Sequence, residues 1–162
     1  MTRLVVQILL VLIFVSGCGP YSFSPSGKSA FKSVYVAQFE NNTIQYEMGD
    51  RLTDAVINAF VQDNTVQVKE SDKAEAVLNG TVISYRRDPH TFDEQDNVTK
   101  YAVKVSIRVK IVKANTEDII WEETFYAEGV YDADTETEEG EGQDRAISLL
   151  TADILDKTTK SW

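Results

Sequence analysis

Four basic residues recur at even-numbered positions of a stretch in which apolar and polar residues alternate, residues 98–113. A period of two predicts a β-strand with one buried face and one wet face. The wet face would carry Lys100, Lys104, Arg108 and Lys110. Ammonium and guanidinium groups at this spacing suit a phosphorylated or carboxylated ligand. The alternative is cross-strand pairing, in which Arg108 would face Glu122 or a neighbour on a return strand.

The single cysteine, Cys18, stands directly after a short apolar segment. One positive charge precedes the run Leu4 to Val15, which is too short for a transmembrane helix but has the length of a signal-peptide core. Val15-Ser16-Gly17-Cys18 resembles the lipobox read by lipoprotein signal peptidase. We therefore expect residues 1–17 to be a lipoprotein signal peptide and the Cys18 thiol to carry a diacylglycerol. An ordinary cleaved signal or an uncleaved anchor is the alternative.

Residues that could support catalysis are few. His90 is the only histidine and lies in a polar stretch, so we interpret it as a surface residue rather than a general base. A lipidated Cys18 leaves no thiol nucleophile, and the sequence has no nucleophile-elbow or histidine-rich metal motif. Gly27-Lys28-Ser29 lacks the upstream glycine of a phosphate-binding loop. We expect no enzymatic activity and no cofactor.

Acidic residues dominate the charge of the chain, which has a formal net charge of −10 at pH 7. This balance argues against nucleic acid as a partner and against electrostatic adsorption to anionic lipid. Membrane attachment would therefore come from acyl chains on Cys18. The stretch 132–144 resembles the start of a calcium loop, but Thr137 replaces the sharp-turn glycine. We expect a solvated loop there, and loose divalent-ion binding stays open.

The remaining chain has the size of one domain. Residues 18–32 are rich in serine, glycine and proline, which favours a lipidated flexible tether. Residues 33–162 would form a single domain. The pattern predicts strands over 33–39, 65–69, 76–87, 98–113 and 119–131, and helices over 45–62 and 144–159. Asp88-Pro89 would end the third strand, and His90 to Asn97 would be a loop.

Apolar residues indicate which faces are buried. The first helix would bury Met48, Leu52, Ala55, Val56, Ala59 and Phe60, and the last helix Ile147, Leu150 and Ile154. On the first strand, Val34, Val36 and Gln38 would share one face and Tyr35, Ala37 and Phe39 the other, both largely apolar. On the later strands the inner positions would be Tyr101 to Ile111 at every second residue, and Ile119, Trp121, Phe125 and Ala127. One-sided helices and a one-sided sheet predict an α+β, two-layer sandwich. Its mixed or antiparallel four-stranded sheet would be packed by two helices.

Several short sequences occur together in one order. They are Cys18-Gly19-Pro20-Tyr21, Val34-Tyr35-Val36, Phe39-Glu40-Asn41-Asn42-Thr43, Arg51-Leu52-Thr53-Asp54-Ala55, Ala74-Glu75-Ala76-Val77-Leu78-Asn79-Gly80-Thr81-Val82 and Ile120-Trp121-Glu122. In this order the chain resembles the lipopolysaccharide-assembly lipoprotein family, LptE. The resemblance covers nearly all of the chain after the signal segment.

The resemblance implies a sheet backed by two helices and a non-enzymatic role. It implies a lipid anchor in the outer membrane, with the domain facing the periplasm. It also implies an LptD-like β-barrel partner, whose lumen the domain plugs, and contact with lipopolysaccharide through basic residues. Gly19 in place of aspartate agrees with outer-membrane sorting. No motif assigns the lipid contacts one by one, so the strand pattern alone makes Lys100, Lys104, Arg108 and Lys110 candidates.

Two other functions fit parts of the sequence. Phe39-Glu40-Asn41-Asn42-Thr43 after a strand also resembles envelope lipoproteins of the curli-secretion or penicillin-binding-protein-activator type. The later Leu-x-Gly-x-Val and Ile-Trp-Glu segments favour the LptE family. A lipid-anchored enzyme is the alternative from another class.

Overall fold

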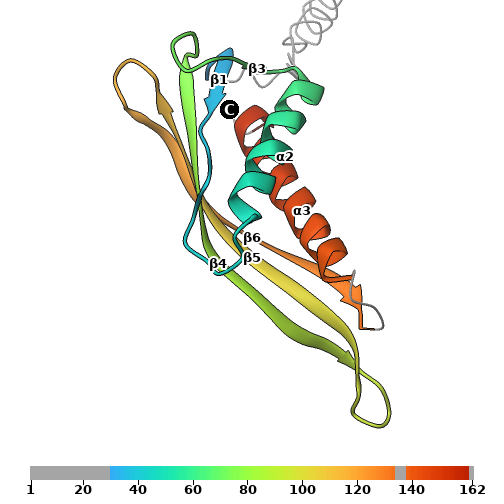
Figure 1. Cartoon of the computed structure of the whole chain (residues 1–162). Coiled ribbons are helices and arrows are strands. Elements are labelled where there is room, and N and C mark those ends of the chain that lie inside the picture. The colour runs from blue at the N-terminus through green and yellow to red at the C-terminus, as the bar shows by residue number, and fades with distance from the viewer. Residues whose placement is uncertain (1–29, 134–137, 161–162) are drawn as a thin grey trace, which may run out of the picture.

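One sheet and two helices form two layers in the computed structural model, which describes residues 30–133 and 138–160 (Figure 1). The elements are β1 (Ser33–Val36), β2 (Glu40–Asn41), α2 (Met48–Asp63), β3 (Gln67–Val68), β4 (Ala76–Phe92), β5 (Val98–Lys113), β6 (Ile119–Asp132) and α3 (Glu138–Lys160). The predicted α+β sandwich with two helices is confirmed. The sheet has six strands instead of four, because β2 and β3 are two-residue strands at its margin.

The sheet is mixed, in the order β3-β1-β4-β5-β6, with β2 also beside β4. β1 runs parallel to both β3 and β4, whereas β4, β5 and β6 form an antiparallel meander. Both helices lie on one face of the sheet, and the β4–β5 hairpin extends well beyond the first turn of α2 (Figure 1). The molecule is therefore elongated along its longest strands.

The core lies between the helices and the inner face of the sheet. Four of the six stripe residues predicted for α2, Met48, Leu52, Val56 and Phe60, are at most 1% exposed, whereas Ala55 and Ala59 are half-buried. α3 buries Ile147, Leu150 and Ile154, and β5 buries every second residue from Val103 to Ile111. β5 also has the bounds that alternation predicted, because its two faces differ sharply in polarity.

The predicted end of the third strand at residue 87 is wrong. β4 continues through Pro89 and His90 to Phe92, with register shifts between Pro89 and Thr91 and between Thr91 and Phe92. Proline interrupts a ladder only where its missing N–H is needed. β2 pairs with β4 at Thr81 and Val82 alone, so the later part of β4 is a sheet edge that tolerates proline.

Two strand predictions fail near the strand ends. The strand predicted over 33–39 ends at Val36, and beyond it Gln38 is exposed and Phe39 turns into the core at 3% exposure. Ile119 is 58% exposed, because a register shift beside Ile111 places the start of β6 out of phase. Trp121, Phe125 and Ala127 are buried as predicted.

α3 begins at Glu138, six residues before the predicted start, within what we expected to be a loop up to residue 144. Carboxylates in the first turns of a helix interact favourably with its positive end. The two glycines in this segment favoured a loop in the sequence, yet Gly142 has a packing role. A Cβ on Gly129 of β6 would lie 1.8 Å from the Gly142 carbonyl oxygen, so helix and strand touch backbone to backbone.

Gly129→Ala should lower the free energy of unfolding by about 1–3 kcal/mol, because α3 must move away from β6 to admit a methyl group. Gly140→Ala is the matched control, since a Cβ at Gly140 meets no atom within 4 Å. That control should be neutral or slightly stabilising. Urea unfolding of both variants measures the difference. Equal stability would mean that the two backbones are not in contact.

Candidate functional site

The four predicted basic residues lie together on the outer face of the sheet, the face that the helices leave uncovered. Lys100 and Arg108 are exposed, and Lys104 and Lys110 are half-buried. Arg86 of β4 pairs in register with Lys104 and joins them. The sequence pattern assigned no faces to this strand, and a register shift between Val82 and Ser84 changes the alternation of β4. We call Arg86, Lys100, Lys104, Arg108 and Lys110 the basic face.

Carboxylates of the neighbouring strands approach three of these cations. Lys100 Nζ lies 3.3 Å from Asp132 Oδ1, and Lys104 Nζ lies 3.1 Å from Asp88 Oδ2. Arg108 Nε is 4.0 Å from Glu122 Oε1, at the limit of an ion pair. The hydrogen bond to Asp88 is the main reason why the pKa of Lys104 is raised above its usual value. These contacts are solvent-exposed, so an incoming anion can compete with them.

Lys110 differs from these three, since it makes no ion pair with any residue that the structure describes. It borders a polar hollow of about 360 Å³ on the outer face. The hollow is lined by Gln38, Glu40, Thr81, Arg108, Lys110 and Glu122, among others. Two cations, the two carboxylates of Glu40 and Glu122 and several neutral polar groups thus line one concave area. Arg108 and Lys110 can offer charged hydrogen bonds to a phosphate or carboxylate group there, against the repulsion of the two glutamates.

The sequence analysis also considered His90 and the acidic stretch 132–144. His90 lies in β4 rather than in a loop, half exposed, with Nδ1 3.0 Å from Glu128 Oε1. Within residues 30–133 and 138–160, no group of three or more histidine, cysteine or carboxylate side chains could hold a metal ion. Residues 134–137 of the acidic stretch, Cys18 and the predicted signal and lipobox lie outside the described residues.

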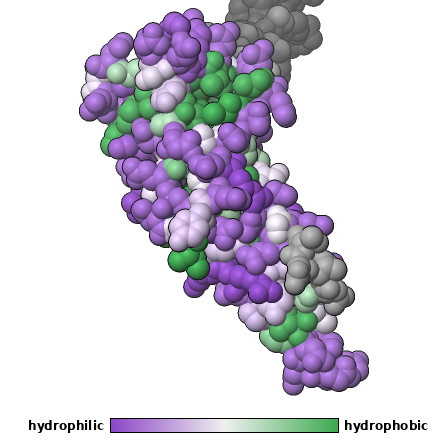
Figure 2. All heavy atoms as spheres, viewed as in Figure 1, coloured by the Kyte–Doolittle hydropathy of each residue, from purple (hydrophilic) through white to green (hydrophobic). Residues whose placement is uncertain are grey.

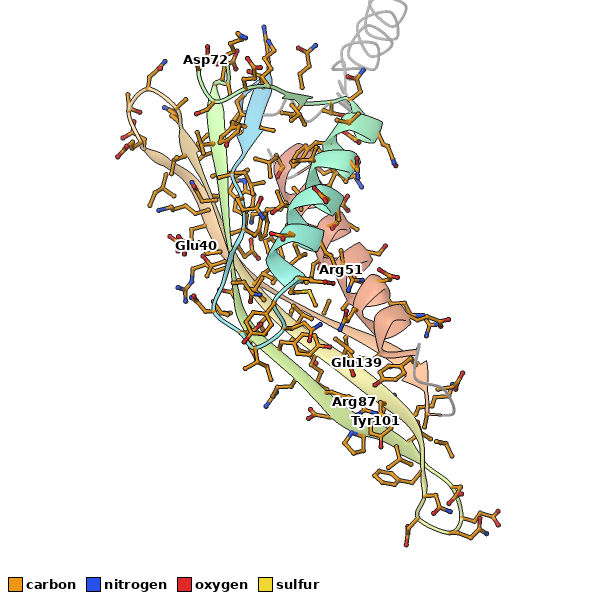
Figure 3. All side chains as sticks on the ribbon, viewed as in Figure 1. Glu40, Arg51, Asp72, Arg87, Tyr101 and Glu139 are labelled. Atoms are coloured by element: carbon orange, nitrogen blue, oxygen red, sulfur yellow. The ribbon has the colours of Figure 1, made fainter. Side chains whose placement is uncertain are left out.

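On the inner face of the sheet, a second polar cluster joins the β4–β5 hairpin to the helices. Figure 3 shows its members Arg87, Tyr101 and Glu139 close together. The Arg87 guanidinium carbon lies 3.9 Å from the centre of the Tyr101 ring, a cation–π contact. Tyr101 stacks on Tyr131 with ring centres 5.9 Å apart, and Arg87 donates a hydrogen bond to the Tyr131 hydroxyl. Glu139 Oε2 of α3 lies 3.8 Å from Arg87 Nε.

Hydrogen bonds continue from this cluster into both helices. The Tyr85 hydroxyl donates to Glu139 at 2.6 Å and accepts from Gln143 Nε2 at 2.8 Å. Burial, followed by the hydrogen bond to Glu139, raises the pKa of Tyr85 above its usual range, so the hydroxyl keeps its proton. Arg51 of α2 donates a hydrogen bond to Gln143 Oε1, and its Nη2 lies 2.6 Å from Asp144 Oδ1 in an ion pair.

This network holds the hairpin in a defined position against the helices. Arg51 and Gln143 are 92 residues apart in sequence, and Tyr85 and Glu139 are 54 apart. No local spacing in the sequence could have indicated these pairs, because only the packing of α2, α3 and β4 brings them together. The contacts are structural in character, since each donor already has a protein acceptor.

Neither described helix is long and apolar enough to cross a membrane. The family model LptE, described as lipopolysaccharide-assembly, matches residues 31–158, which includes the whole sheet, α2 and all but the last two residues of α3. No curated protein matches the chain.

Solved structures share the fold at low sequence identity. A protein from Xanthomonas campestris is 14% identical, with a TM-score of 0.64, and the match covers 83% of this chain and 89% of that one. PelC from Paraburkholderia phytofirmans, described as a dodecamer, is 18% identical, with a TM-score of 0.58 and coverage of 80% and 89%. A lipoprotein from Caulobacter crescentus, described as putative, is 16% identical, with a TM-score of 0.53 and coverage of 75% and 85%. At these identities the likeness concerns the fold alone.

Proposed function

Because this chain belongs to the LptE family of lipopolysaccharide-assembly proteins, we propose that it is an outer-membrane lipoprotein that binds an LptD-like β-barrel. In this function the domain plugs the barrel from the periplasmic side and assists the transport and assembly of lipopolysaccharide. It performs no catalysis and needs no cofactor. The family match over residues 31–158 is the observation that carries the proposal.

The surface of the sheet supports a position inside a barrel. The lumen of a transmembrane β-barrel is polar, so an occupant must present polar groups to it. The outer face of β4, β5 and β6 carries interspersed cations and carboxylates, including Lys104, Asp88 and Glu122. The elongated sheet also offers a long surface to a surrounding wall (Figure 1).

The anchor in this proposal is the lipid on Cys18, with residues 1–17 removed as a signal peptide. Residues 18–32 then act as the tether between membrane and domain. Phe31, near the end of this segment, is 4% exposed and packs in the core, so the tether joins the domain there. Gly19 agrees with outer-membrane retention.

The test of this function is recovery of the barrel. Gentle detergent extraction and affinity purification of the full-length tagged protein should yield one stoichiometric outer-membrane barrel protein, identified by mass spectrometry. Recovery of a cell-wall synthase or a secretion pore instead would support the alternative lipoprotein types. Purification without any membrane partner would contradict the proposal.

Lipopolysaccharide contact is assigned to the basic face, and most strongly to the hollow beside Arg108 and Lys110. The headgroup of this lipid carries phosphates, for which charge-assisted hydrogen bonds are the natural recognition. Alternate outward residues along a strand lie roughly 6.5–7 Å apart, so Lys104, Arg108 and Lys110 can span one headgroup. Arg86 and Lys110 make no ion pair with a described residue, and Arg108 Nε approaches Glu122 Oε1 only to 4.0 Å.

Reversing the charges of Lys104 and Arg108 together should weaken lipopolysaccharide binding at least about tenfold, since each charged hydrogen bond contributes about 1.5–3 kcal/mol. The thermal stability should change little, because the ion pairs are exposed. Binding to purified lipopolysaccharide and a melting curve are measured on each variant. Lys69→Glu, at an exposed position outside the basic face, is the control.

A purely structural role of the same residues makes a different prediction. Arg108→Glu would then lose a little stability, Glu122→Arg would restore it, and lipid binding would stay unchanged. The double-mutant cycle with both readouts separates the two roles. Wild-type binding by the doubly reversed protein would place any lipid site elsewhere.

A further inference from the structure

The loop from Asn41 to Tyr46, which joins β2 to α2, exposes two large apolar side chains. Ile44 is 85% exposed and Tyr46 is 90% exposed, and these are the highest values among the exposed large hydrophobic residues of the described chain. The loop lies where the sheet edge meets the start of α2 (Figure 1). Figure 2 shows a small apolar patch at this place, within a hydrophilic surface.

Side-chain hydrogen bonds give this loop one conformation. Asn41 Oδ1 accepts the backbone N–H of Thr43 at 3.0 Å and the Thr43 hydroxyl at 2.8 Å. Asn41 Nδ2 donates to the carbonyl oxygen of Gln45 at 2.6 Å, and the Gln45 N–H donates to Thr43 Oγ1 at 3.3 Å. The side chains of Asn41 and Thr43 thus form the inside of the loop, and Ile44 and Tyr46 are displayed outside it.

Both ends of the loop are fixed to the core. Phe39 precedes it at 3% exposure, and Met48 follows it at 0%. The Asn42 N–H continues the β2 ladder by donating to the Val82 carbonyl at 3.0 Å. The ordering entropy of the loop is therefore lost when the domain folds and not when a partner binds. Preorganised aromatic and aliphatic side chains are typical anchors of protein interfaces.

The charges around the loop indicate the chemistry of its partner. Glu40, Glu47 and Asp50 are exposed beside it. Of the cations nearby, Arg51 pairs with Asp144, and Arg108 and Lys110 share a hollow with Glu40. An acidic border repels anionic lipid headgroups, so a membrane surface does not suit this loop. The complementary surface is a protein with an apolar pocket bordered by basic side chains.

We propose that the loop Asn41–Tyr46 is the main anchor of this domain on its protein partner, with Ile44 and Tyr46 entering an apolar pocket bordered by lysine or arginine. The identity of the partner rests on the proposed function, in which it is the LptD-like barrel. Ile44 and Tyr46 are not part of the basic face, but Glu40 beside the loop also lines the hollow with Arg108 and Lys110, so protein binding and lipid binding use adjacent surfaces.

The test measures the affinity of the full-length protein for the purified LptD-like barrel of the same bacterium, in detergent. Ile44→Ser with Tyr46→Ser should weaken binding at least about 30-fold, the effect expected for a hot spot. Val61→Ser with Leu149→Ser is the control, since it removes two exposed apolar side chains from the helices. It should change affinity less than about twofold. Asn41→Ala, which keeps both anchors but releases the loop, should give an intermediate loss.

The outcomes separate this inference from the proposed function. If the wild type fails to bind the barrel, the proposed function is wrong and the proposed anchor is overturned with it. If the wild type binds and the Ile44/Tyr46 variant binds equally well, the anchor is overturned while the proposed function stands. A photo-crosslinker at position 46 should label the barrel. Binding to vesicles of phosphatidylethanolamine and phosphatidylglycerol is measured for the same variant. If the variant loses vesicle binding but keeps its affinity for the barrel, the loop contacts a membrane and the proposal is overturned.

Discussion

Leu52→Asp should leave the domain unfolded. Leu52 is completely buried in the middle of the α2 stripe, and its side chain faces the core between the helices and the sheet. A carboxylate at this position would be surrounded by apolar groups without a cation to pair with. An uncompensated buried charge costs about 3–5 kcal/mol or more, which is a large part of the total stability of a small domain.

Circular dichroism and a thermal melt of the purified variant measure this effect. Asp54→Ala is the matched control two residues away, because Asp54 is exposed on the opposite side of α2. The control should melt within a few degrees of the wild type, since exposed substitutions change stability little. Two variants with the same melting temperature would show that α2 presents another face to the sheet.

Cys18→Ser should abolish lipid attachment altogether. The expected modification is a thioether, and a serine hydroxyl cannot replace the thiol in forming it. The variant should accumulate as the unprocessed precursor or appear in soluble fractions. Attachment of the wild type depends on acyl chains, of which each buried methylene contributes about 0.8 kcal/mol.

Labelling of cells with radioactive palmitate, followed by membrane fractionation, measures this outcome. Ser16→Ala is the control, because it keeps a small residue before the cysteine and should leave labelling intact. Palmitate incorporation into the Cys18→Ser protein would contradict the lipobox assignment. Barrel binding by the soluble variant would further separate anchoring from partner recognition.

The sequence predicted those elements whose two faces differ in polarity over a long stretch. β5 alternates for its full length, and α2 places four apolar residues on one stripe, so both were found with their correct faces. The basic face followed from β5 alone, because alternation on a single strand determines which side chains share a side. Arg86 was missed because the sequence pattern assigned no faces to its strand, whose alternation changes at a register shift in β4.

The predictions failed at residues whose type is explained by the tertiary structure and not by the local sequence. Pro89 favoured the end of a strand, but it lies at a sheet edge where its missing N–H is tolerated. Gly142 favoured a loop, but it permits the backbone of α3 to touch Gly129 of β6. In both cases the role of the residue depends on where it lies in the folded domain, at a sheet edge for Pro89 and against another element for Gly142.

The sequence by itself determined the two-layer architecture, the buried stripes of both helices and the basic side of β5, because hydrophobic periodicity is a local property of each element. Only the tertiary structure decided which carboxylates meet those cations, how Arg51, Tyr85, Arg87 and Glu139 join the hairpin to the helices, and that Ile44 and Tyr46 stand outside the core. These features depend on contacts between residues distant in the chain. The positions of such residues are determined by the packing of whole elements, which no single stretch of sequence contains.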